Sequence, residues 1–196
     1  MRVVLVDDGE ALHESASRLW PEILVLPNTD VVSIPVAYGT AFVSPCPSRG
    51  DMTAHAVDVA YSGAMFPGIA SRVRDAIRAV GAPDRAGGTF LCPGCAVVVD
   101  DLVVAPTMLV PGDVSATRNA YLAMSAALWA ARDAGFGTLV VPGLCTGVGG
   151  MSTDDSVAQM KAAFDDIVGS SRHGVSIEQA LAEQPPGDGV FGEKNA

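Results

Sequence analysis

The stretch from 138 to 168 constrains the fold of this chain more than any other. Thr138–Val141 is an apolar run of strand length, and four glycines follow between 143 and 150. A segment with helical spacing then begins at Ser152 or Thr153, with Val157, Met160, Phe164 and Ile167 on its buried face. A strand, a glycine loop and a helix in this order are typical of α/β folds, which bind ligands beyond the carboxyl ends of their strands.

The rest of the chain also alternates between strands and helices. We expect strands at 2–6, 31–36, 40–44, 96–99, 102–107 and 138–141, and helices at 10–20, 57–66, 69–80, 115–134 and from 152 or 153 onward. Residues 81–94 are expected to form a loop. Several strands are apolar on both faces, so helices must cover both sides of the sheet. The sequence therefore predicts an α/β/α sandwich formed by one domain, 1–182, with a flexible C-terminal tail, 183–196.

Composition excludes some functions. The chain has 196 residues, is 49% hydrophobic and carries a formal net charge of −10, which argues against general nucleic-acid binding and against docking on an anionic membrane. No apolar run approaches the length of a membrane span, and the acidic start MRVVLVDD does not resemble a signal peptide. We expect a cytoplasmic protein whose four cysteines are reduced.

The glycine loop has the features of an anion site. Gly147, Val148, Gly149 and Gly150 could present successive backbone N–H groups to a diphosphate at a helix N-terminus. A P-loop would require a Lys and a Ser or Thr at the end of the loop, and a dinucleotide-binding fingerprint would require a different glycine spacing. The alternative is a glycine-rich turn that holds no ligand.

Two segments together resemble the macrodomain family of ADP-ribose-binding modules, in particular a bacterial and phage-type branch. In a first loop (residues 44–58) the matching residues are Ser44, Pro45, Ser48, Gly50, Met52, Val57 and Asp58, followed by Ala60 and Tyr61. In the glycine loop (residues 143–151) they are Pro142, Gly143, Leu144, Thr146, Gly147, Val148 and Gly149. Val104–Met108 also matches, and the order of elements agrees over roughly 1–168.

The resemblance implies a mixed, mostly parallel sheet of about six strands and a cleft that binds ADP-ribose, with no metal and no cofactor. Asp58 and His55 are then the catalytic candidates of a hydrolytic member, because a carboxylate can orient or deprotonate water. The implied ligand-binding residues are Ser44, Ser48, Val57, Gly143, Leu144, Cys145, Thr146, Gly147, Val148, Gly149, Gly150 and Met151.

Three positions depart from the family pattern. Pro47 stands where hydrolytic members carry an Asn, and 54–56 replace a Gly-Gly pair with Ala-His-Ala. The usual adenine-binding Asp aligns near Ser33, and Asp30 is an offset candidate. These departures affect hydrolysis and adenine recognition, whereas the glycine loop keeps its pattern.

Each candidate residue also has a structural interpretation. Asp58 could be an ordinary helix N-terminal acid, His55 a solvated loop residue, and Cys145 a small residue packed beneath its loop. Asp7 and Asp8 could end a strand at a solvated edge. Cys92-Pro-Gly-Cys95 is a single CxxC without a second ligand pair, and it precedes a strand rather than opening a helix. A zinc or redox role is therefore disfavoured.

Three functional hypotheses follow. The first is a macrodomain-like binder of ADP-ribose or a related nucleotide diphosphate sugar. The second is a hydrolase of ADP-ribosyl bonds, on a small molecule or a macromolecule, that uses Asp58. The third is a non-catalytic structural or assembly protein whose cleft has drifted.

Overall fold

A computed structural model describes residues 1–53, 56–84 and 87–168. The predicted tail 183–196, the last part of the predicted domain (169–182) and the catalytic candidate His55 lie outside the described residues.

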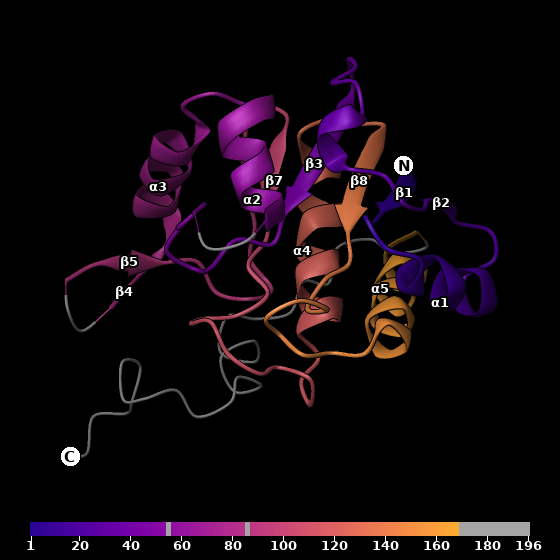
Figure 1. Cartoon of the computed structure of the whole chain (residues 1–196). Helices are drawn as coiled ribbons and strands as arrows, with labels where there is room; N and C mark the ends of the chain where they lie inside the picture. Colours follow the sequence, from indigo (N-terminus) through magenta and orange to yellow (C-terminus); the bar gives the residue numbers. More distant parts are fainter. Residues whose placement is uncertain (54–55, 85–86, 169–196) are drawn as a thin grey trace.

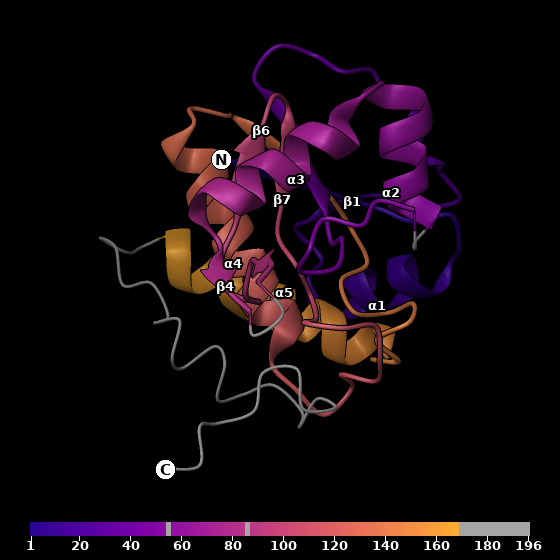
Figure 2. The same ribbon diagram turned by 90° about the vertical axis from the view of Figure 1, so that its left-hand side faces the viewer.

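Six strands form one mixed, mostly parallel sheet in the order β2-β1-β8-β3-β7-β6. Figure 1 labels β2, β1, β8, β3 and β7 along this sheet, and Figure 2 labels β6. The sheet consists of β1 (Arg2–Val6), β2 (Leu24–Leu26), β3 (Thr40–Ser44), β6 (Val97–Val99), β7 (Leu102–Val104) and β8 (Thr138–Pro142). Only β6 runs antiparallel to its neighbour, as the predicted hairpin around Asp100-Asp101 requires. The central strand β8 pairs with both β1 and β3, so the carboxyl ends of these three strands meet at one edge.

Helices cover both faces of this sheet (Figures 1 and 2). Three pack on one face: α1 (Ala11–Leu19), α4 (Asn119–Asp133) and α5 (Thr153–Val168). The other face carries α2 (Ala56–Ala60), the π-helix η2 (Tyr61–Met65) and α3 (Ile69–Val80). The predicted three-layer α/β/α sandwich is confirmed.

Alternating strand residues supply the two halves of the core. Val3 and Leu5 of β1 pack with the α1, α4 and α5 layer, whereas Val4 and Val6 face the α2 and α3 layer. Strand β8 follows the same alternation: Leu139 and Val141 pack with the α1, α4 and α5 layer, whereas Val140 faces the α2 and α3 layer. A strand buried on both faces reads as a continuous apolar run, which is why these strands were recognisable.

The region between β1 and β3 differs from the prediction. The predicted strand at 31–36 is wrong, because Val31–Ser33 forms a 3₁₀ helix, η1. The carboxylate of Asp30 accepts a 3.1 Å hydrogen bond from the Val32 N–H and turns the chain there. The strand in this region is instead β2, a short segment between two prolines.

Two smaller differences concern boundaries. The predicted loop 81–94 contains a short antiparallel pair, β4 (Ala82–Pro83) and β5 (Thr89–Phe90). Helix α4 begins at Asn119 rather than at Ser115, because residues 114–117 form a turn in which Thr117 N–H bonds to the Val114 carbonyl at 3.0 Å. Within the described residues, no helix has the length and apolar character needed to cross a membrane.

Candidate functional site

A cleft of about 500 Å³ lies where β1, β3 and β8 end. Residues 6–8, which include the last residue of β1, line it together with 29–31, Pro45, part of α2, residues 107–108 and the glycine loop. Its volume falls in the range of roughly 300–1,000 Å³ that is usual for small-molecule sites. Its place at the carboxyl ends of parallel strands is where α/β folds bind ligands.

The glycine loop folds into turns held by its own backbone. Gly150 N–H bonds to the Gly147 carbonyl at 3.0 Å, and Met151 N–H bonds to the Cys145 carbonyl at 3.0 Å. The N–H groups of Gly147, Val148 and Gly149 donate no hydrogen bond to any described residue. All three residues line the cleft, and no acceptor among the described residues occupies their N–H groups.

At two glycines of this loop, a side chain would lie too close to neighbouring atoms. A Cβ on Gly149 would lie 2.6 Å from the Cys145 carbonyl oxygen, and one on Gly143 would lie 2.7 Å from Thr146 Oγ1. A Cβ on Gly147 would meet nothing within 4 Å. The tight packing shapes the loop at Gly143 and Gly149, whereas Gly147 leaves open room in the cleft.

Three other predicted ligand-binding residues of the loop, Leu144, Gly150 and Met151, do not line the cleft. Leu144 and Met151 are buried in the core and do not line the cleft, and Gly150 is exposed with a φ of +67°. Ser156 Oγ of α5 donates a 2.6 Å hydrogen bond to the Leu144 carbonyl, which anchors the loop to that helix. Cys145 lines the cleft but is 4% exposed, and its burial raises the pKa of the thiol to about 12.

The N-terminus of α5 is already compensated by the chain itself. Ser152 Oγ accepts a 3.1 Å hydrogen bond from the Asp155 N–H, and Asp154 and Asp155 place two carboxylates in the first turn. Asp154 is in turn held by Ser15 and Arg18 of α1. Since these acids satisfy the positive end of the helix dipole, a bound anion would rely on the loop N–H groups instead.

Asp58 lies inside the protein rather than in the cleft. Its side chain is fully buried, and Ser44 Oγ donates a 2.6 Å hydrogen bond to Asp58 Oδ1. Burial raises the pKa of Asp58 to about 7, the Ser44 hydrogen bond opposes this, and the charge of Asp51 adds to it. Asp58 does not line the cleft, whereas its neighbours Val57 and Ala60 do.

The first loop is also fixed by buried serine contacts. Ser48 is fully buried, and its Oγ donates a 2.6 Å hydrogen bond to the Leu109 carbonyl. Neither Ser44 nor Ser48 lines the cleft. Of the predicted first-loop ligand residues, only Val57 therefore reaches it.

The charged residues that line the cleft are all acidic: Asp7, Asp8 and Asp30. Burial raises the pKa of Asp7, with the adjacent Asp8 adding to the effect and a 2.7 Å hydrogen bond from the Gly9 N–H opposing it. Within the described ranges, no group of three or more His, Cys, Asp or Glu side chains could hold a metal ion. The cleft therefore offers acceptors from carboxylates and donors from the loop backbone.

The sequence interpretation missed part of this lining. Asp7 and Asp8 were expected at a solvated edge, but β1 lies next to the central strand β8, so its carboxyl end opens into the cleft. The available signal was their position directly after a fully apolar strand. Thr29, Thr107 and Met108 also line the cleft, and nothing local in the sequence identifies Thr29.

The chain matches none of the protein-family models with which it was compared. A comparison with curated proteins gave no match either. The cleft and its loops are therefore the observations from which a function can be proposed.

Proposed function

We propose that this protein is a macrodomain-like binder of ADP-ribose or a related nucleotide diphosphate sugar. The observation that carries the proposal is the run of three unpaired N–H groups, Gly147 to Gly149, in a cleft at the carboxyl ends of the strands. Successive backbone N–H groups in a glycine loop form a concave anion site that does not need lysine or arginine. A diphosphate provides enough oxygens to accept from all three.

The acidic residues favour a ligand that carries more than phosphate. Carboxylates repel a phosphate, but they accept hydrogen bonds from sugar hydroxyls and from a base amino group. Asp7, Asp8 and Asp30 would supply these acceptors. Asp30 is also the acid nearest in sequence to Ser33, the position that aligns with the family's adenine-binding Asp. A nucleotide diphosphate sugar combines both requirements, whereas inorganic pyrophosphate meets only one.

Thermal unfolding with ADP-ribose, ADP, AMP and pyrophosphate tests the proposal. A ligand at 100 times its Kd adds about 2.7 kcal/mol to the free energy of unfolding, which in a domain of this size raises Tm by roughly 5–10 °C. We expect the largest shift with ADP-ribose and little shift with AMP or pyrophosphate. No shift with ADP-ribose or other nucleotide sugars at millimolar concentration would contradict the proposal and favour the structural or assembly role.

A hydrolase acting on ADP-ribosyl bonds is the second candidate, because a carboxyl with a pKa of about 7 is suited to general-base catalysis. Against it, Asp58 is fully buried, does not line the cleft and accepts a hydrogen bond from Ser44. Turnover of an ADP-ribosylated substrate by wild type and by Asp58→Asn tests this function. Turnover that requires Asp58 would support it, and equal turnover would remove Asp58 from the mechanism.

The proposed partner is ADP-ribose, free or attached to a small molecule or macromolecule. The cytoplasm is the proposed location, in keeping with the four free cysteines expected from the sequence.

A further inference from the structure

The segment Cys92-Pro93-Gly94-Cys95 forms a tight turn between β5 and β6. Cys95 N–H donates a 2.9 Å hydrogen bond to the Cys92 carbonyl, and Gly94 has a φ of +89°. Proline at the second position, a positive φ at the third and an i to i+3 hydrogen bond define a type II turn. The turn holds the backbones of the two cysteines close together.

This geometry is compatible with a disulfide. A hydrogen-bonded β-turn brings its first and last Cα atoms within about 7 Å, and disulfides span Cα separations of roughly 4.4–6.8 Å. Both residues are free cysteines, and they occupy the first and last positions of this turn. Two thiols held this way can close a disulfide without moving the strands on either side.

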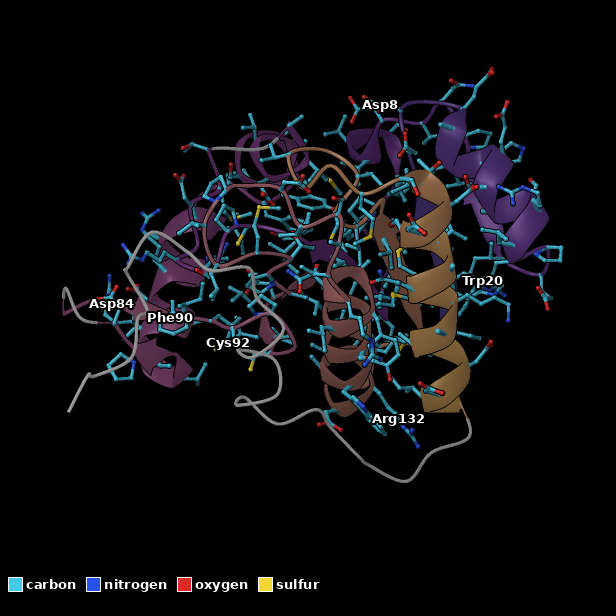
Figure 3. All side chains as sticks on the ribbon, turned by 90° about the horizontal axis from the view of Figure 1, so that it is seen from below. Asp8, Trp20, Asp84, Phe90, Cys92 and Arg132 are labelled. Atoms are coloured by element: carbon cyan, nitrogen blue, oxygen red, sulfur yellow. The ribbon has the colours of Figure 1, made fainter. Side chains whose placement is uncertain are left out.

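The two cysteines differ in their access to solvent. Cys92 is 2% exposed, whereas Cys95 is only partly buried. Neither lines the cleft, and Figure 3 shows Cys92 well away from the cleft residue Asp8, on the side of Phe90 and Asp84. A reagent in solution would therefore reach Cys95 first, and the pair is separate from the nucleotide site.

The chemical states of the thiols also differ. The hydrogen bond with Cys92 lowers the pKa of Cys95 to about 7, while the pKa of Cys92 is raised. Burial raises the pKa of the two remaining cysteines, Cys46 and Cys145. Because the thiolate is the reactive form, Cys95 is the nucleophile among the four.

We propose that Cys92 and Cys95 are a redox-active dithiol that exchanges with low-molecular-weight disulfides such as oxidised glutathione. The Cys95 thiolate attacks one sulfur of glutathione disulfide, whose S–S bond breaks and releases one glutathione thiolate. Cys92 then loses its proton to solvent, and its sulfur attacks Cys95 in the mixed disulfide and releases the second glutathione. Two protein thiols are oxidised to one disulfide while glutathione disulfide takes up the two electrons.

A metal is the other use of a CxxC pair. Structural zinc requires four ligands, and within the described part of the chain no third His, Cys, Asp or Glu is grouped with this pair. The sequence alone disfavoured redox use because the pair does not open a helix. In the structure, the pair instead occupies the two ends of a hydrogen-bonded turn, which brings the two cysteine backbones close together.

Trypsin offers a direct readout in the full-length protein. Cleavage after Arg85 and Arg118 gives a peptide, 86–118, that contains Cys92 and Cys95 and no other cysteine. Cys46 and Cys145 fall singly in other peptides, 19–49 and 133–161, and serve as internal controls. The protein is equilibrated at stepped ratios of oxidised to reduced glutathione, quenched by alkylation, digested and analysed by mass spectrometry.

We expect peptide 86–118 to lose both alkylatable thiols together and to become lighter by two hydrogen atoms as the ratio rises. When the alkylating quench is made under denaturing conditions, Cys46 and Cys145 should remain alkylatable at every glutathione ratio. A peptide 86–118 that keeps both thiols at the most oxidising ratio would overturn the proposal.

Two variants test the order of attack. Cys92→Ser should accumulate a stable glutathione adduct on Cys95, because no resolving thiol remains. In the Cys95→Ser variant, the remaining thiol of Cys92 should react with oxidised glutathione no faster than the buried Cys46. An adduct that forms on Cys92 in Cys95→Ser, but not on Cys95 in Cys92→Ser, would contradict the assigned roles.

Discussion

Ser44, the last residue of β3, donates a 2.6 Å hydrogen bond to Asp58 in α2, and both side chains are fully buried. The second carboxyl oxygen, Asp58 Oδ2, and the nearby hydroxyl of Tyr61 find no hydrogen-bond partner among the described residues. Burial raises the pKa of both groups, and the charge of Asp58 adds to the rise at Tyr61. The first loop therefore holds a carboxyl group in the interior that favours its protonated form.

The free energy of unfolding should fall as pH rises from about 4 to about 7. The pKa of Asp58 is about 7 in the folded protein against an ordinary value of 3.8, so the unfolded chain releases this proton first. The folded state binds more protons in that window, and the loss levels off above pH 7. The difference of about three units sets an upper bound of about 4 kcal/mol on this contribution.

Urea unfolding of wild type and Asp58→Asn between pH 4 and pH 8 measures this effect. Other groups titrate in the same range, so the readout is the difference between the two proteins. The wild type should lose stability relative to Asp58→Asn as pH rises, whereas Asp75→Asn, which alters an exposed pair with Arg78, should run parallel to wild type. A constant difference between wild type and Asp58→Asn across this range would show that Asp58 ionises normally.

Gly149→Ala should destabilise the protein by about 1–3 kcal/mol, because the new methyl group would lie 2.6 Å from the Cys145 carbonyl and 2.9 Å from Val114. Gly147→Ala, two residues away in the same loop, should not destabilise it, since its Cβ meets nothing within 4 Å. Urea midpoints of the two variants check the contrast. Equal losses in both would mean that the loop does not have this packing.

Ser156→Ala should cost about 1–3 kcal/mol, because it leaves the Leu144 carbonyl without its buried donor. The exposed Ser17 of α1 provides a matched Ser→Ala control, which should change stability by less than about 0.5 kcal/mol. Thermal unfolding of the pair measures the difference. If Ser156→Ala were as stable as the control, the link between α5 and the glycine loop would contribute nothing.

Asp30→Asn should weaken binding of ADP-ribose about tenfold if this carboxylate accepts a hydrogen bond from the ligand, a loss of about 1.4 kcal/mol. Asp101→Asn, which does not line the cleft, should leave the Kd unchanged. Isothermal titration gives both values. Unchanged affinity in Asp30→Asn would place the sugar and base away from η1.

The sandwich was predictable because its strands and helices carry strong local patterns. Thr40–Ser44 and Ile69–Val80 were predicted with the bounds that β3 and α3 have. The strand predicted at 31–36 was wrong because its β-branched residues favour a strand, whereas Asp30 holds a turn there by accepting hydrogen bonds from Val32 and Ser33. Strand β2 has only three residues, and its pairing with β1 is the tertiary contact that makes it a strand.

The candidate site was predictable only in part. The glycine loop is continuous in sequence, so its pattern indicated the turn, but the N–H of Gly150, expected as a donor to a ligand, bonds to the Gly147 carbonyl instead. The burial of Asp58 depends on Ser44, 14 positions earlier, and the acidic lining depends on where β1 pairs in the sheet. Such placements come from packing between distant segments, and no local pattern encodes them.

Titration of ADP-ribose into wild type and Gly147→Asp tests the central claim most directly. A carboxylate at Gly147 would lie beside the proposed diphosphate in open space, so it should repel the ligand without disturbing the fold. Gly63→Asp, at another open position that does not line the cleft, is the matched control. We predict that Gly147→Asp lowers affinity at least tenfold while Gly63→Asp binds as wild type does. Equal affinity in all three proteins, or no binding by wild type, would contradict a phosphate site at the glycine loop.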